Sequence, residues 1–187
     1  MPSTEALILR HYFELQGFLV RQCLPTSTSG IESMQIVNPQ ARRQEEIPAI
    51  LFSSDLPRIK NAVVWLPNWN ALKITPAFLK NAAELEKFIN KRLAERKTPK
   101  EIEDGDYLKI IVVPAVPTVE PYRGETMDVL RAHRIDSMLS FRSVLQDLIA
   151  RLDVRQVREG LQLLQILSNF DLLKTTQMEL FNDERKK

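Results

Sequence analysis

The sequence contains one cysteine, Cys23, and only two histidines among its 187 residues. A single cysteine excludes an internal disulfide and a cysteine zinc site, and it fits a reducing cytoplasm. His11 and His133 are too far apart to show metal-ligand spacing. We therefore expect Cys23 to be a buried strand residue. We expect His11 on the surface of a first helix, and His133 near the end of another, where a cation is favourable.

Glycine and long apolar runs are also scarce. The five glycines, at positions 17, 30, 105, 124 and 160, are too dispersed for either glycine-rich nucleotide-binding fingerprint. A G-x-S-x-G nucleophile elbow is absent as well. No segment reaches the roughly 18 apolar residues of a membrane span, and the N-terminus does not resemble a secretion signal. With 26 basic and 24 acidic residues, the net charge of +2 neither requires nor excludes nucleic acid. We predict a cytoplasmic protein without a membrane partner.

Apolar periodicity and turn residues divide the chain into helices and strands. Residues 31–41 are ambiguous, although "MQIV" can form a short strand. The predicted strands are 18–24, 47–52, 61–67, 107–116 and 135–141, and the predicted helices are 3–17, 75–97, 124–134, 142–152 and a last one from 153. This order predicts an α/β fold, with a mixed central sheet flanked by helices. We expect one domain over residues 1–170 and a C-terminal tail over 171–187.

Four carboxylates stand out around the predicted strand 47–52. Glu14 lies on the first helix, Glu45 and Glu46 open the strand, and Asp55 follows it. Carboxylates at the mouth of a buried strand can hold a hard metal ion. They can equally be solvated residues at the entry of an ordinary strand. Pro48 removes one backbone donor, which predicts that this strand lies at an edge or begins irregularly.

The segment "ALILRHYFELQGFLVRQ" begins a recognisable order of elements. It is followed by a strand opened by glutamate, a strand ending near a tryptophan, a long helix and the strand "YLKIIVV". Over roughly residues 5–152, the chain resembles the restriction-endonuclease-like, or PD-(D/E)XK, superfamily, and the resemblance implies a core of that fold. In active members, an acid on the first helix, an Asp in the second strand and a Glu-x-Lys in the third bind Mg²⁺ and orient water.

The catalytic positions of that superfamily are only partly filled here. Glu14 matches the acid on the first helix, but Pro48 occupies the place of the strand Asp. The acid-x-Lys falls at Trp65, Leu66 and Pro67, which can neither ligate a cation nor move a proton. The resemblance therefore implies a nuclease-like domain that has lost its activity and needs no cofactor.

An active enzyme with a relocated site is the alternative. In such a Mg²⁺-dependent deoxyribonuclease, Glu45 or Glu46 would replace the missing Asp, and Lys60 or Lys73 would replace the missing lysine. The catalytic set would be Glu14, Glu45, Glu46, Asp55 and Lys73, with Glu14, Glu46 and Asp55 as metal ligands. This alternative requires at least two independent replacements.

The tail carries a second resemblance, independent of the first. "QMELF" is similar to the bacterial sliding-clamp-binding pentapeptide, with Gln177, Leu180 and Phe181 at the matching positions. Met178 is a near-isosteric substitute for leucine, and Glu179 keeps the acidic option of the motif. A short apolar motif near a charged terminus can reach a partner without disturbing the fold. Alternatively, Leu180 and Phe181 fold back onto the domain.

Two groups of basic residues are candidates for contact with phosphates, or are simply solvated faces. They are Lys87, Lys91, Arg92, Arg96, Lys97 and Lys100 on the long helix, and Arg131, Arg134 and Arg142 later in the chain. Taken with both resemblances, they predict a non-enzymatic accessory or interaction protein of DNA metabolism or repair, recruited to the sliding clamp. A scaffold protein with no DNA role is a third possibility.

Overall fold

The computed structural model describes residues 2–23, 31–67, 81–93, 107–117, 119 and 121–151. The strands are β1 (Leu19–Cys23), β2 (Ile31–Val37), β3 (Ile50–Leu51), β4 (Asn61–Pro67), β5 (Leu108–Val113) and β6 (Ser137–Ser140). The helices are α1 (Thr4–Leu15), the 3₁₀ helix η1 (Ser53–Arg58), α3 (Ala82–Phe88), the π helix η3 (Ile89–Leu93), α5 (Tyr122–Ala132) and α6 (Phe141–Arg151). The chain forms two compact units, Met1–Val144 and Leu145–Lys187. The predicted boundary between 170 and 171 lies outside the described residues.

The strands form one mixed sheet in the order β1-β2-β4-β5-β6-β3. β1, β2 and β4 pair antiparallel, whereas β4, β5, β6 and β3 pair parallel. Trp65 at the centre of the sheet lies opposite Ser33 of β2 and Ile111 of β5. The predicted α/β fold with a mixed central sheet is therefore confirmed.

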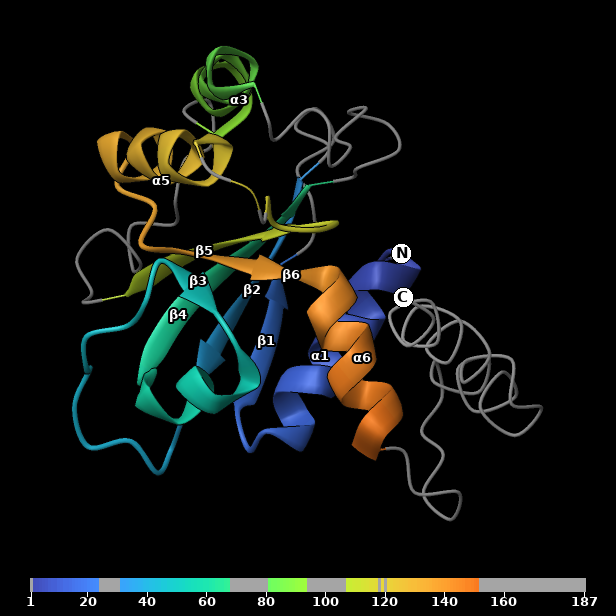
Figure 1. The fold of residues 1–187 in the computed structure, drawn as a ribbon. Coiled ribbons are helices and arrows are strands. Elements are labelled where there is room, and N and C mark those ends of the chain that lie inside the picture. Colours follow the sequence, from blue (N-terminus) through green and yellow to red (C-terminus); the bar gives the residue numbers. More distant parts are fainter. Residues whose placement is uncertain are drawn as a thin grey trace, which may run out of the picture. The chain divides into compact units, whose positions relative to one another are not determined.

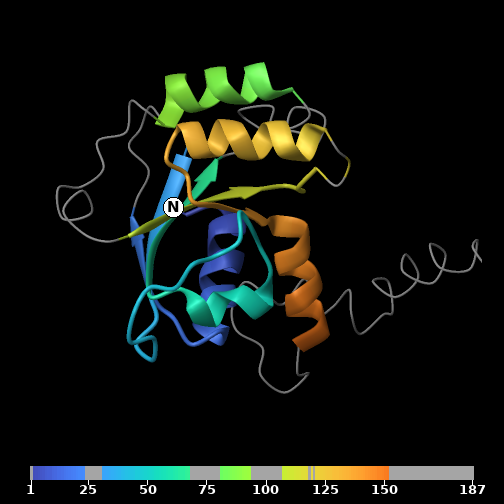
Figure 2. The ribbon, with the colours of Figure 1, turned by 60° about the vertical axis from the view of Figure 1, so that its left-hand side comes forward.

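Within Met1–Val144, helices cover both faces of the sheet (Figures 1 and 2). α3 and α5 lie on one face and α1 lies on the other. α1 buries Ala6, Leu9 and Phe13 completely. Under α3 and α5, side chains of alternate strand positions join those of the two helices in one apolar cluster, as the period of two along a strand requires. Its members are Ile31, Val63, Trp65, Leu85, Ile89, Ile111, Val113, Met127, Leu130, Ile135 and Met138.

α1 has the ends that the sequence predicts. The Ser3 hydroxyl accepts the Ala6 N–H at 3.1 Å, so Ser3 is the N-cap residue. The carboxylate of Glu32, on β2, accepts the Ser3 N–H at 3.0 and 3.2 Å and ties the start of the helix to the sheet. At the other end, Gly17 has a φ of +88°, a conformation that glycine adopts without steric cost.

The predicted continuous helix 75–97 is wrong at Asn81. That residue is extended (φ −113°, ψ 95°), and its side-chain oxygen accepts the Glu84 N–H at 3.2 Å. Asn81 is therefore the N-cap of α3, because a short polar side chain satisfies a backbone donor better there than it would inside a helix. The proposed cap at Thr75 and Pro76 lies outside the described residues.

The predicted strand 47–52 is wrong in length, and it is not the second strand of the chain. Only Ile50 and Leu51 form a strand, at the edge of the sheet beside β6, and the second strand along the chain is β2. Ala49 C=O accepts the Met138 N–H at 2.9 Å. Residue 48 lies before the paired residues of β3, next to a bend at Ala49, so a proline there removes no donor from the pairing with β6. Pro48 fits there, which confirms the predicted edge position.

β1, β4, β5, β6, α5 and the described part of α6 agree with the predicted elements within a few residues. β6 begins after a tight turn in which Arg134 has a φ of +55°. Asp136 then makes two hydrogen bonds with the Lys109 backbone. Its carboxylate accepts the Lys109 N–H at 2.6 Å, and its own N–H donates to the Lys109 C=O at 2.9 Å. Among the described residues, no helix is long and apolar enough to cross a membrane.

Candidate functional site

Glu14, the predicted acid of the first helix, lies in a cluster of charged and titratable groups along α1. Its carboxylate accepts a hydrogen bond from Arg10 Nε at 2.8 Å. On its other side, His11 Nδ1 lies 3.7 Å from Glu14 Oε2. The His11 side chain is only 16% exposed, so the expected surface position is wrong. Both partners of Glu14 come from one turn of the same helix, as residues three and four apart do.

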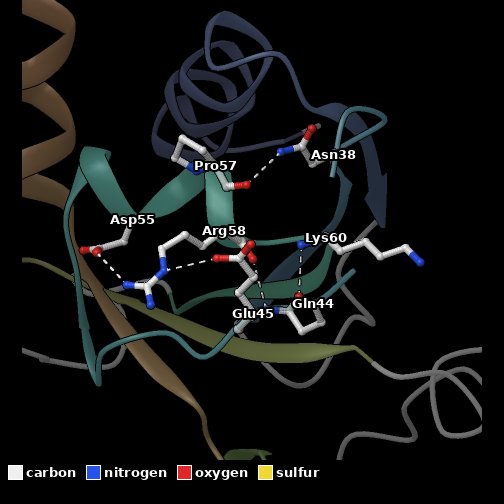
Figure 3. Close-up of polar contacts among 7 residues, drawn as sticks. All are labelled: Asn38, Gln44, Glu45, Asp55, Pro57, Arg58 and Lys60. Carbon is white, nitrogen blue, oxygen red and sulfur yellow. Dashed lines mark hydrogen bonds and ion pairs between the residues drawn. The ribbon is translucent and has the colours of Figure 1, made fainter. Parts of the chain in front are cut away.

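Glu45 and Asp55 do come together, but around an arginine (Figure 3). Arg58 Nε lies 3.7 Å from Glu45 Oε2, and Arg58 Nη1 lies 3.8 Å from Asp55 Oδ1. Both distances exceed hydrogen-bond length, so these are loose ion pairs. Arg58 is also about half exposed, with 45% of its side chain accessible, and water screens the pairs further.

Asp55 has a second role, at the end of β3. Its Oδ2 accepts the Phe52 N–H at 3.0 Å, and its own N–H donates to the Phe52 C=O at 3.0 Å. This reciprocal pair starts η1 immediately after the strand and leaves the Phe52 side chain 56% exposed. The Asp55 carboxylate therefore stabilises a turn and an arginine at once.

Gln44, which no sequence pattern identifies, completes this cluster. Its side-chain Oε1 accepts the Lys60 N–H at 3.0 Å, and its Nε2 donates to the Arg58 C=O at 3.4 Å. The amide thus bonds the chain just before β4 as a neighbouring strand would. The Lys60 side chain points away from the cluster (Figure 3). For Arg58, the available signal was its position three residues after Asp55 on one helical turn; no pattern pointed to Gln44.

Chemically, this arrangement is a structural tie rather than an assembled metal centre. The Arg58 guanidinium lies between Glu45 and Asp55 and offsets part of their negative charge, so a divalent cation there would have to compete with it. In the described ranges, no three His, Cys, Asp or Glu side chains are placed to share a metal ion. Glu46 is exposed beside Glu45. Lys73, the lysine of the relocated site, lies outside the described residues.

Four members of the two basic groups lie in one helical layer, on the other face of the sheet from α1, whereas Arg142 lies on α6. Lys87 of α3 and Lys91 of η3 are exposed, as are Arg131 and Arg134 at the end of α5. α3 lies beside α5 in both views (Figures 1 and 2). The layer is mixed in charge, since Asp128 lies 3.7 Å from Arg131. The four remaining basic residues of the long helix lie outside the described residues or have side chains that are not described.

The described residues have the α/β architecture that the first resemblance implies. The tail that carries the second resemblance lies outside the described residues. Cys23 is the last residue of β1, a strand residue as expected. No family model matches the chain, and no matching curated protein or solved structure was found.

Proposed function

We propose that this chain is a nuclease-like domain without nuclease activity that serves as an accessory protein of DNA metabolism. The order of elements supports the nuclease-like core: a helix, three antiparallel strands, a helix and a parallel strand, formed by α1, β1, β2, β4, α3 and β5. The loss of activity is supported by the carboxylates, since Glu14 bonds Arg10 and both Glu45 and Asp55 face Arg58.

The observation that carries the DNA-associated role is the convergence of basic residues on α3 and α5. The contact between His133 and Glu86, at 3.9 Å, brings the end of α5 next to α3. Lys87 follows Glu86 directly, and Arg131 and Arg134 flank His133. Cations gathered on one face displace counterions from DNA, which gives affinity that falls as salt rises.

Binding of fluorescent duplex and single-stranded DNA at several salt concentrations tests this role. We expect measurable affinity at low salt, which weakens as the salt concentration rises. The double variant Lys87→Gln with Arg134→Asn removes two of the cations, and the asparagine tolerates the left-handed backbone at position 134. Its log–log salt slope should fall by about 1 for each lost phosphate contact.

The matched control is Arg42→Gln with Arg43→Gln, which removes the same charge from the exposed loop before Gln44. This control should bind DNA like the unaltered protein. Equal losses in both double variants would show that net charge matters rather than the α3–α5 face. Absence of any salt-sensitive binding would favour a scaffold without a DNA role. Mg²⁺-dependent cleavage that disappears in Glu14→Ala would instead establish the relocated nuclease site.

Recruitment to a bacterial sliding clamp is the second part of the proposal, and it rests on the sequence of the tail. Gln177 would bond at a small polar site of the clamp, while Met178, Leu180 and Phe181 would fill its apolar pocket. Replacing Leu180 and Phe181 with alanine should abolish capture of the purified clamp and leave the unfolding midpoint unchanged. The matched control is Thr175→Ala with Thr176→Ala. A large loss of stability would show that the tail packs on the domain.

A further inference from the structure

Two buried ring nitrogens lack a hydrogen-bond partner among the described residues: Nδ1 of His11 and Nε2 of His133. Buried polar atoms in folded proteins are almost always hydrogen-bonded, so each exception calls for a physical reason. Both nitrogens lie near a carboxylate. His11 Nδ1 is 3.7 Å from Glu14 Oε2, and His133 Nε2 is 3.9 Å from Glu86 Oε1.

The two histidines differ in what their partners connect. His11 and Glu14 belong to the same turn of α1, so a charge on His11 would join nothing new. His133 is the C-cap residue of α5, while Glu86 lies on α3. The helices already share the apolar cluster under them through Leu85, Ile89, Met127 and Leu130. The His133–Glu86 contact adds the polar link between these two helices.

We propose that His133 is a proton-operated latch that fastens α3 to α5 through Glu86. Nε2 lies 3.9 Å from the carboxylate, without a hydrogen bond within range among the described residues. When the ring is protonated, both nitrogens are donors and the ring carries a positive charge, so the same contact becomes an ion pair. The position at the C-terminus of α5 also favours a cation, because the helix dipole is negative there.

The other charged groups on the surrounding elements set the balance of this latch. They are Glu84 and Lys87 on α3, Lys91 on η3, Arg123, Glu125, Asp128 and Arg131 on α5, Arg134 and Asp136 in the turn before β6, and Lys109 on β5. Asp128 pairs with Arg131, and the Asp136 carboxylate is held by the Lys109 backbone. Among the described residues, Glu86 is the acidic group within ion-pair distance of His133. The latch therefore depends on Glu86.

Hydrogen–deuterium exchange of the α3 amides at pH 8 and pH 5.5 tests the latch directly. Protection factors are compared, since they correct for the intrinsic pH dependence of exchange. We expect acidification to raise the α3 protection factors about two- to fivefold, the range of a partly exposed ion pair. Glu86→Gln should abolish the rise without unfolding the protein, because the Glu86 side chain is 56% exposed.

Three further variants, two of them controls, test whether the rise depends on the His133–Glu86 contact. Glu84→Gln removes a neighbouring exposed charge from α3 and should keep the full rise. His11→Gln removes the other histidine and should also keep it, whereas His133→Gln should lose it. An α3 protection that stays constant or falls on acidification in the unaltered protein would overturn the latch, as would a rise that survives in Glu86→Gln. No DNA is present, so the result is independent of the proposed function.

Discussion

Two apolar segments of similar length and composition have different fates in this fold. Residues 61–67 form β4, a central strand of seven residues with pairing partners on both sides. Residues 47–52 contribute only the two residues of β3, at the edge of the sheet. Each segment contains a proline, Pro67 at the end of β4 and Pro48 before β3. Apolar composition alone therefore does not distinguish a central strand from an edge segment.

The difference follows from where each segment can use its backbone donors. β4 lies between β2 and β5, so each of its N–H groups faces a paired strand. Residues 47–52 have β6 on one side only, and Ser137 Oγ, at 2.7 Å, satisfies the Pro48 C=O with a side chain instead of a strand. Beyond Leu51, Asp55 captures the Phe52 N–H and begins a helix. Burial is set by the side chains, but strand length is set by the backbone partners.

The strongest test of this comparison is to place a proline in β4 and to remove the proline that precedes β3. Ala62→Pro places a proline in β4, where the lost N–H faces another strand. It should cost at least about 3 kcal/mol of unfolding free energy. Pro48→Ala should change that energy by less than about 1 kcal/mol, because residue 48 lies before the residues of β3 that pair with β6. Urea unfolding measures both, and circular dichroism shows whether Ala62→Pro folds. A tolerated proline at 62 would refute the backbone explanation.

Equal truncations of one leucine in each segment give the next largest effect. Leu66 of β4 and Leu51 of β3 are 3% and 1% exposed. Leucine-to-alanine changes in a core cost about 2–5 kcal/mol, and more where the surroundings cannot relax. We expect Leu66→Ala near the upper end and Leu51→Ala near the lower end, because an edge segment can adjust. Equal costs in urea unfolding would mean that β3 is packed as rigidly as β4.

Ser137→Ala tests the side-chain substitute for strand pairing. The variant removes the hydroxyl that donates to the Pro48 C=O. Ser137 itself is completely buried. It should cost about 1–3 kcal/mol, measured by urea unfolding. Ser54→Ala is the control, because Ser54 is exposed on η1 and its removal should change stability by about 0.5 kcal/mol or less. A neutral Ser137→Ala would show that β3 keeps its place without this bond.

Arg58→Gln concerns the connection between the two segments and should have the smallest effect. Its pairs with Glu45 and Asp55 are loose and about half exposed, so their loss should cost at most about 1 kcal/mol. Both strands should keep their hydrogen-exchange protection. Arg42→Gln on the nearby exposed loop is the control for charge. A loss of protection in β4 itself would mean that the Arg58 cluster helps to position the central strand.

Much of this fold was predictable because local signals and burial agree. Ser3 and Gly17 mark both ends of α1, and "LKIIVV" becomes the buried strand β5. The failures occurred where local signals compete. Asn81 resembles an ordinary helical residue within an apolar stripe, yet its side chain caps a helix. β2 was predicted only in part, as "MQIV", because the adjacent polar residues Glu32 and Ser33 interrupt the apolar pattern.

The candidate site was predictable only in part, for a similar reason. The sequence identifies Glu45 and Asp55 as acidic residues near one strand, and the structure brings them to one place. Sequence spacing does not reveal which cation lies between them, because Arg58 reaches both carboxylates from the far end of η1. Gln44 acts through a side-chain amide bonded to the backbone, a type of contact with no periodic signature. The metal-site and clamp-binding hypotheses stay predictions.

The two hydrogen bonds between Asp136 and the Lys109 backbone affect the register of the parallel half of the sheet. A hairpin turn sets the alignment of antiparallel strands, but parallel strands such as β5 and β6 have no such turn. A slip of β6 by one residue would turn Met138 to the face of the sheet opposite Ile111. Two backbone groups of Lys109 are held by one aspartate immediately before β6 begins. Asp136 thus fixes the register of β6 against β5. It thereby sets the face of the sheet that each side chain of β6 occupies.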